Sequence, residues 1–249
     1  MQTFKKEDNL HKAWLYRVLE AIADNDYLVS VLYFKGGTCA SMLGRLDRFS
    51  VDLDFDYAGQ VSELEKTKSL LEKVYEDLGL EIKDKSKKGL QYFLKYENTI
   101  GGRSTIKIDA SFPLYKNSIY EIQKFEEIQR ILKCQTIETM FAHKLCALMD
   151  RFEKTGHIAG RDIYDIHYFF LQGYSYNQEV IEERTGMDAK KYFAKLLGFI
   201  ESEVTLKIIT EDLNPLVSAE KFKILRKVLV REVLMFLKQE IQSIFEAQN

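Results

Sequence analysis

Hydrophobic positions along the first part of the chain alternate between the spacing of helices and that of strands. Residues 8–23 carry apolar side chains at helical spacing, which predicts an amphipathic helix. Val29–Phe34 is short, apolar and β-branched, and Gly36 follows it, which predicts a buried strand leading into a tight turn. Val51–Tyr57 alternates strictly between apolar and acidic residues, which predicts a strand with one acidic face.

Further elements follow in the first half. A short helix is expected from Thr38 to Gly44, where the chain leaves the glycine turn. Ser62–Glu65 has the pattern of a capping box, which predicts a helix running to about residue 78. Leu90–Tyr96 and Ser104–Phe112 resemble strands and flank a glycine-containing loop, which predicts an antiparallel hairpin.

The second half has helical spacing throughout. Helices are expected over residues 136–152, 161–171, 188–203 and 218–246. The chain is therefore expected to have an α+β fold. An α/β core with a mixed sheet flanked by helices would span residues 1–133, and a helical domain packed on it would span 134–249.

Composition excludes several classes of protein. No stretch of the chain reaches the ~18 apolar residues of a membrane span, so no membrane association is expected. The first ten residues lack the apolar core of a secretory signal. The three cysteines, Cys39, Cys134 and Cys146, show no CxxC spacing, which is typical of free thiols in a reducing cytoplasm. The formal net charge of −2 does not indicate a dedicated nucleic-acid binder.

The charge is nevertheless uneven. Seven basic residues fall between positions 83 and 107, where only Asp84 and Glu97 oppose them, so the segment carries a local charge of +5. Such a segment is either a solvated surface or a site that contacts a polyanion.

A glycine motif, Lys35-Gly-Gly-Thr38, lies between the predicted strand and the short helix. Glycines let a ligand approach the backbone closely, and N–H groups at a helix start favour phosphate. Thr38 could add a hydroxyl donor. The alternative is an ordinary strand-to-helix turn.

A pair of acids, Asp52 and Asp54, lies on the acidic strand. A period of two places both carboxylates on one face, where they repel each other unless a cation lies between them. Hard oxygen ligands of this kind suit Mg²⁺ or Mn²⁺. Asp56 continues the face, so the alternative is a solvated edge strand, and Asp56 itself is interpreted as peripheral.

A third acid, Asp109, lies in the second strand of the predicted hairpin, with Lys107 on the same face. A carboxylate from a neighbouring strand could complete a two-metal site. The alternative is an aspartate that caps a turn at the end of the strand.

Charged residues also occur in the apolar helical half. Lys144 shares a helical stripe with apolar residues, so it must snorkel, pair with an acid or bind an anion. Asp162 and Asp165 fall on one helix face, where acids in a first turn also stabilise the helix dipole.

Taken in order, these motifs resemble a known family. The glycine motif, Asp-x-Asp some 14 residues later and a distant third Asp resemble the nucleotidyltransferase fold of the DNA polymerase β superfamily. Phe34-Lys-Gly-Gly-Thr38 with Arg48-Phe-Ser-Val-Asp-Leu-Asp-Phe55 is similar to the AbiEii/MenT nucleotidyltransferase toxins. The segments around Lys144 and Arg151, and Arg161-Asp162-x-x-Asp165, resemble that family's downstream motifs. The resemblance covers roughly residues 10–170, and residues 172–249 carry no informative motif.

The resemblance implies roles for particular residues. The metal ligands would be Asp52, Asp54 and Asp109. The nucleotide would contact Gly36, Gly37, Thr38, Arg48 and Lys144, with Ser50 orienting the acidic strand. Asp162, from the helical domain that completes the cleft, would join Lys144 and the three metal ligands as a residue important for activity.

The function expected from the resemblance is metal-dependent transfer of a nucleoside monophosphate from an NTP to an acceptor hydroxyl. The protein would be a toxin of a toxin–antitoxin or phage-defence system, with tRNA 3′ ends as acceptor and a cognate antitoxin as a further partner. Two alternatives remain open. The acceptor could be a protein or a small molecule, or the chain could be an inactive module that binds a nucleotide or a partner.

Overall fold

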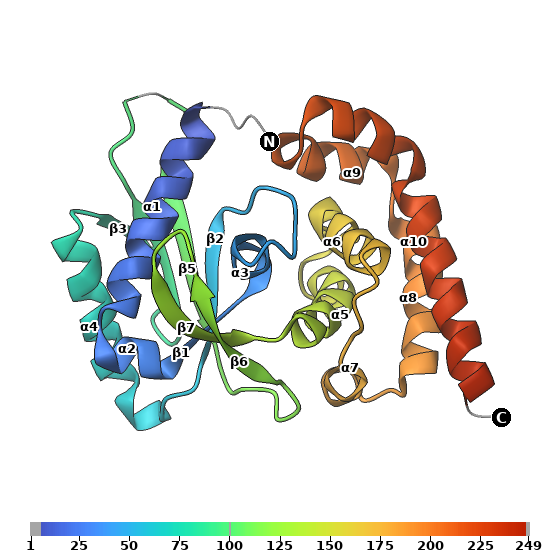
Figure 1. Ribbon diagram of the computed structural model, residues 1–249, viewed down its shortest axis with the longest axis horizontal. Helices are drawn as coiled ribbons and strands as arrows, with labels where there is room; N and C mark the ends of the chain where they lie inside the picture. Colours follow the sequence, from blue (N-terminus) through green and yellow to red (C-terminus); the bar gives the residue numbers. More distant parts are fainter. Residues whose placement is uncertain (1–5, 100, 248–249) are drawn as a thin grey trace. The chain divides into compact units, whose positions relative to one another are not determined.

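The computed structural model describes residues 6–99 and 101–247, which form two compact units (Figure 1). One unit comprises the chain up to Leu114 together with Ile119–Thr136. The other comprises Tyr115–Ser118 and the chain from Ile137 onward. The short segment Tyr115–Ser118 thus belongs with the helical half although it precedes two strands of the sheet.

A seven-stranded mixed sheet organises the first unit, in the order β3-β4-β5-β2-β1-β7-β6. The pairs β2–β5 and β1–β7 are parallel, and the other neighbours are antiparallel. The strands are β1 (Leu32–Lys35), β2 (Asp52–Tyr57), β3 (Glu81–Lys85), β4 (Leu90–Lys95), β5 (Thr105–Ser111), β6 (Tyr120–Phe125) and β7 (Arg130–Gln135). This mixed sheet with a helical second half confirms the predicted fold class.

The two faces of the sheet differ in chemistry. One face is apolar, with Phe34, Leu53, Phe55 and Ile108 almost fully buried. Helices α1 (Lys6–Ala23), α2 (Asp26–Val31) and α4 (Leu64–Asp77) cover it, and α4 follows the short 3₁₀ turn η1 (Val61–Glu63) (Figure 1). The other face carries the acids of β2, and α3 (Gly36–Met42) lies against it. The strict alternation of β2 therefore places its acids on the face away from the core.

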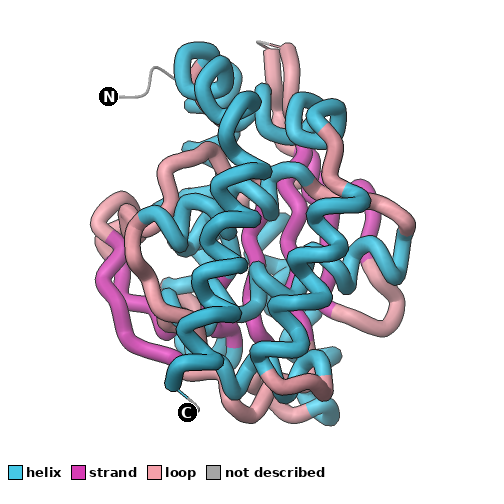
Figure 2. Tube along the Cα trace, turned by 90° about the vertical axis from the view of Figure 1, so that its right-hand side faces the viewer, coloured by secondary structure: helices cyan, strands magenta, loops and turns pink. Residues whose placement is uncertain are grey.

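The second unit is entirely helical. Its long last helix packs along α6 and α8 (Figure 2). The helices are α5 (Ile137–Thr155), α6 (Gly160–Leu171), α7 (Gln178–Thr185), α8 (Ala189–Glu203), α9 (Leu206–Leu213) and α10 (Ala219–Ala247), with the 3₁₀ turn η2 (Asn214–Leu216) before α10. None of the helices in the described part of the chain combines the length and hydrophobicity that a bilayer span needs.

Several predicted boundaries were wrong. The buried strand begins at Leu32 and not at residue 29, because the Asn25 side chain accepts hydrogen bonds from the Tyr27 and Leu28 N–H groups and starts α2 there. The capping box does not form, because the Ser62 hydroxyl donates to the Gln60 side chain. The expected hairpin of β4 and β5 is confirmed, with Lys95 opposite Thr105.

Six helices and strands were not predicted from the sequence: α2, β3, β6, β7, α7 and α9. Each is only five to eight residues long, and each of the three strands contains at least two charged residues that interrupt an apolar pattern. The three cysteines are buried free thiols, as expected.

Candidate active site

Polar side chains from four neighbouring strands lie side by side on the polar face of the sheet, with the acids on β2 and β5. In the parallel pairing of β2 with β5, Asp54 is opposite Asp109 and Asp52 is opposite Lys107. On the other side of β2, the antiparallel pairing with β1 places Lys35 opposite Asp54. Gln91 of β4 is opposite Asp109. Because paired residues in adjacent strands point to the same face, these side chains form a single polar surface.

Asp109 is oriented by two donors from its own surface. Gln91 Nε2 donates to Asp109 Oδ2 over 2.8 Å, and Lys107 Nζ donates to the same oxygen over 2.5 Å. The two side chains of the Lys107–Asp109 pair are each 31% exposed. The carboxylate is therefore held in place by an ammonium and an amide while still accessible to solvent.

Asp56 has a different environment, although it belongs to the same alternating strand. Its carboxylate is buried and accepts hydrogen bonds over 2.6–3.1 Å from Lys35 Nζ, Gln135 Nε2, Tyr120 Oη and Ser111 Oγ. Burial raises the pKa of Asp56, but the Lys35 ammonium and the surrounding hydrogen bonds outweigh it, so the pKa lies below its ordinary value. Asp56 therefore binds β2 to its neighbours and is not solvated.

The glycine motif makes room for the acids. Gly36 has φ +79°, and a Cβ built on it would lie 2.6 Å from Asp54 Oδ2. A Cβ on Gly37 would meet Ser50 Oγ at 2.9 Å and Arg48 Nη2 at 3.0 Å. The backbone at both glycines is thus in contact with side chains that the sequence assigned to the site.

Thr38 and Arg48 contact the backbone of this segment. Thr38 Oγ1 donates to the backbone carbonyl of Asp52 over 2.5 Å, so the start of α3 is fixed to the start of β2. Arg48 is only 4% exposed, and its Nη1 donates to the Phe49 carbonyl over 2.9 Å. Both side chains support the loop that carries Ser50 and the first acid.

The donor set suits a hard divalent cation by its chemistry. Asp52, Asp54 and Asp109 supply carboxylate oxygens on one half-exposed face, and the gap at Gly36 lets Asp54 approach the backbone. Within residues 6–99 and 101–247, no three acidic, histidine or cysteine side chains are already arranged around a common metal position. The ammonium of Lys107 is bound to Asp109 and lies where a cation shared with the other carboxylates would contact it. A cation at Asp109 would have to share or displace this ammonium.

A second charged cluster lies inside the helical unit. Lys144 Nζ of α5 is 3.1 Å from Asp162 Oδ1 and 2.9 Å from Asp165 Oδ2, both on α6. Arg151 Nη2 is 3.3 Å from Asp162 Oδ2. Burial raises the pKa of Asp162, but the surrounding cations, Lys144 foremost, lower it to about 2. The lysine on the apolar stripe therefore pairs with two buried acids that share one helix face.

Sequence reasoning missed several residues of the polar face. Lys35 was part of the glycine motif but had no assigned role, and Gln91 was not considered. Tyr120 and Gln135 lie on β6 and β7, which the sequence did not predict. Among these residues, the sequence pattern indicated only Lys107 as a neighbour of the site, because it shares a strand face with Asp109.

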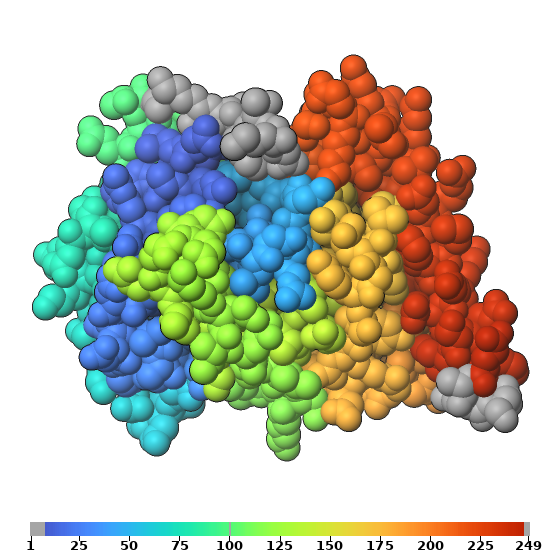
Figure 3. Space-filling model, viewed as in Figure 1, coloured from blue at the N-terminus to red at the C-terminus, as the bar shows by residue number. Residues whose placement is uncertain are grey.

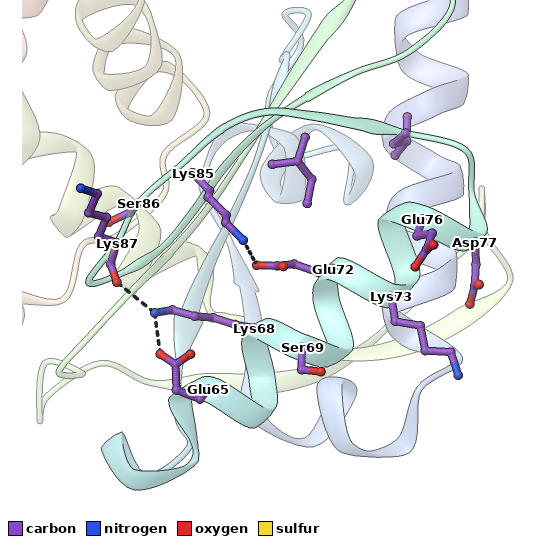
Figure 4. Close-up of a pocket in the computed structure, with 12 residues that line it drawn as sticks. Glu65, Lys68, Ser69, Glu72, Lys73, Glu76, Asp77, Lys85, Ser86 and Lys87 are labelled. Carbon is purple, nitrogen blue, oxygen red and sulfur yellow. Dashed lines mark hydrogen bonds and ion pairs between the residues drawn. The ribbon is translucent and has the colours of Figure 1, made fainter.

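Three of the seven basic residues in segment 83–107 form ion pairs. Lys85 pairs with Glu72 over 2.8 Å and Lys95 pairs with Glu81 over 3.6 Å, in addition to the pair made by Lys107. A groove of about 1150 Å³ lies beside this segment, between α4 and β3 (Figure 4). Four acidic and four lysine side chains line it. This groove has no net charge that would favour an anion, and α4 belongs to the layer on the apolar face of the sheet.

Comparison with known proteins identifies the family. Residues 17–244 match the family described as nucleotidyl transferase AbiEii toxin, type IV toxin–antitoxin system. The chain belongs to this family. The AbiEii assignment confirms the resemblance seen in the motifs and extends it over residues 172–244, which the sequence motifs did not reach.

Solved structures share the AbiEii chain's fold. JHP933 from Helicobacter pylori is 19% identical, with 99% of this chain and 100% of that chain covered and a TM-score of 0.52. A candidate nucleotidyltransferase from H. pylori is also 19% identical, with 95% and 98% covered and a TM-score of 0.56. Identity at this level supports the fold alone. No curated protein matches the sequence.

Family membership establishes the general activity. The chain is a nucleotidyltransferase toxin, which uses an NTP and has an antitoxin as its partner in a type IV system.

Proposed function

We propose that this AbiEii toxin transfers a nucleoside monophosphate from an NTP to a hydroxyl of an acceptor, with Mg²⁺ or Mn²⁺ held by Asp52, Asp54 and Asp109. The row of carboxylates on β2 and β5, beside the Gly36 backbone, carries this proposal. When bound, divalent cations lower the pKa of the acceptor hydroxyl and stabilise the leaving oxygens. The acceptor oxygen forms a bond to the α-phosphorus, the bond from that phosphorus to the bridging oxygen breaks, and pyrophosphate leaves.

Asp109 would also receive the acceptor. Lys107 and Gln91 both donate to Oδ2, so Oδ1 is the oxygen that would accept a hydrogen bond from the acceptor hydroxyl. The hydroxyl proton would pass through this contact to solvent. The ammonium of Lys107 holds the carboxylate in one orientation for this role.

The triphosphate would lie along the glycine motif. The missing Cβ atoms of Gly36 and Gly37 leave the backbone open to a close approach, and Thr38 fixes this backbone to β2. The buried Arg48 and the half-buried Ser50 would support it from behind, and Arg48 would add positive charge near the phosphates.

Lys144 would neutralise phosphate charge during transfer, and Asp162 would position it. The support is the contact of Lys144 Nζ with two buried carboxylates, which fixes an ammonium that retains partial exposure. Lys144→Ala would then lower kcat more than it raises KM for the NTP. If kcat and KM of this variant equal those of wild type, Lys144 takes no part in the reaction.

The acceptor that we propose is the 3′ end of tRNA. The experiment uses purified protein, Mg²⁺, each α-labelled NTP in turn and total tRNA, with Asp54→Ala as the control. Label in the tRNA band that ribonuclease removes, and that the control lacks, supports the proposal and identifies the nucleotide. Label that survives ribonuclease and lies in a protein or a small molecule would show that this molecule, and not tRNA, is the acceptor. NTP binding without transfer to any acceptor would favour an inactive binding module.

A role in phage defence is part of the same proposal. The intact set of acids supports an active toxin, because a module that only binds would not require three carboxylates beside the glycine motif. Cells expressing Asp54→Ala should grow normally, whereas cells expressing the wild-type toxin should stop growing.

A further inference from the structure

The first half of α10 carries an unusual concentration of positive charge. Residues 221–231 contain Lys221, Lys223, Arg226, Lys227 and Arg231 and no acid, a local charge of +5 in a chain whose net charge is −2. No other role has been assigned to these residues. A helix segment with this composition attracts polyanions.

The line of charges and the buried apolar residues lie on opposite sides of this helix, and Ile224 is an exposed apolar residue beside the charges. Phe222, Leu225 and Leu229 are buried against the rest of the helical unit. Lys223, Lys227 and Arg231 recur at every fourth position and are exposed. Side chains at this spacing follow one another along a helix at intervals of about 6 Å. They form a line of three cations on the outer side of α10, which lies at the surface of the molecule (Figures 2 and 3).

These cations are available for binding. Among the described residues, the side chains of Lys223, Arg226, Lys227 and Arg231 form no ion pair. Further along the helix the situation changes, because Lys238 pairs with Glu201 over 3.2 Å. The basic segment 83–107, in contrast, has three of its charges in ion pairs. What distinguishes α10 is that its exposed cations without an ion pair follow one another along one helix, with no acid among residues 221–231.

We propose that the line of Lys223, Lys227 and Arg231 binds the phosphate backbone of a structured RNA that serves as acceptor. The inference rests on the proposed function, since it assumes an RNA acceptor. A regular line of exposed cations suits a chain of phosphates, which positions an RNA without reading its sequence. Insertion into a membrane is disfavoured because the continuous apolar stripe of α10, which includes Phe222, Leu225 and Leu229, is buried in the protein, and its exposed apolar residues, Ile224, Met235 and Phe245, are scattered singly.

The test compares two triple variants of the full-length protein that remove equal charge. K223Q/K227Q/R231Q removes the line on α10, and K83Q/K87Q/K88Q removes three exposed lysines of the other basic segment. Binding of total tRNA is measured by fluorescence anisotropy without divalent cation or NTP, from about 50 to about 200 mM salt. Thermal unfolding of each variant confirms that these exposed substitutions leave the fold intact.

The α10 variant should bind tRNA at least roughly tenfold more weakly than wild type. The slope of log affinity against log salt should fall by about 2 to 3, as the loss of three phosphate contacts requires. The control should bind like wild type. Equal loss in both variants would show a general effect of charge, and loss in neither would show that α10 does not bind RNA. Either result would overturn the inference, as would an α10 variant that loses only binding to anionic phospholipid vesicles.

Failure of the inference can be separated from failure of the proposed function. Asp54→Ala should bind tRNA as wild type does, because binding needs no transfer. If wild type binds tRNA through α10 but transfers label only to protein, the line still binds RNA and the proposed acceptor is wrong. If label enters tRNA equally in wild type and in the α10 variant with unchanged affinity, the proposed function stands and the inference fails.

Discussion

Asp54 and Asp56 lie two residues apart on one strand, yet the structure predicts opposite consequences when each is replaced by alanine. Asp56→Ala removes a buried carboxylate and leaves the Lys35 ammonium and three neutral donors without their acceptor. Asp54→Ala removes a half-exposed carboxylate that is paired in register with Asp109 on the same face. Loss of one like charge relieves repulsion there.

The expected magnitudes follow from burial. Removing one partner of a buried, hydrogen-bonded ion pair costs about 3–5 kcal/mol. For a chain of this size, that corresponds to a fall in Tm of roughly 6–20 °C. Asp54→Ala should change the free energy of unfolding by less than about 1 kcal/mol.

The assay is urea unfolding followed by circular dichroism, together with thermal unfolding, in the absence of divalent cation. Nucleotide transfer is then measured for the same samples. Asp54→Ala should be as stable as wild type and inactive. If Asp54→Ala is destabilised as much as Asp56→Ala, or if Asp56→Ala costs under about 1 kcal/mol, the division of β2 into one structural and two functional acids is wrong.

Three further outcomes are expected. The folded-state pKa of Asp162, about 2, lies below its ordinary 3.8, so its contribution of about 2 kcal/mol to stability is present above pH 4 and is lost as the pH falls towards 2. In urea unfolding, the free energy of unfolding should therefore fall less between pH 5 and pH 3 for Asp162→Asn than for wild type. Gly36→Ala and Gly44→Ala both place alanine at positive φ, and this backbone strain should cost each variant about 1 kcal/mol of stability. Only the methyl group of Gly36→Ala would meet Asp54, so only this variant should weaken Mn²⁺ binding in a titration followed by electron paramagnetic resonance. Equal Mn²⁺ affinity of the two variants would contradict this. Lys107→Met should tighten Mn²⁺ binding by up to roughly tenfold, because a competing ammonium is lost, and weaker binding would show that the ammonium assists the cation.

The sequence was sufficient where the pattern is local. The alternation in β2 predicts which residues face the core, because the period of two is fixed by the backbone. Lys144 on an apolar helix predicts snorkelling, an acidic partner or a bound anion, because an isolated ammonium there is costly. The structure confirms the first prediction, and among the three alternatives for Lys144 it shows the acidic partner.

The sequence was insufficient where the environment comes from distant strands. Asp54 and Asp56 have the same local pattern, and Tyr120 on β6 and Gln135 on β7 are among the donors that make Asp56 a buried acceptor. Those strands are short and each contains two charged residues, so neither their existence nor their place beside β1 could be inferred. The role of Lys35 was hidden for the same reason, since it depends on the pairing of β1 with β2.

The central claim is that the acidic face of β2 and β5 catalyses transfer of a nucleoside monophosphate. The most direct measurement compares α-labelled with γ-labelled NTP, in Mg²⁺ and in chelator, for wild type and Asp54→Ala. The account predicts that only the α label enters the acceptor, that the γ label leaves in pyrophosphate, and that both the chelator and the substitution abolish transfer. Transfer of the γ label, or transfer that persists in Asp54→Ala, would contradict it.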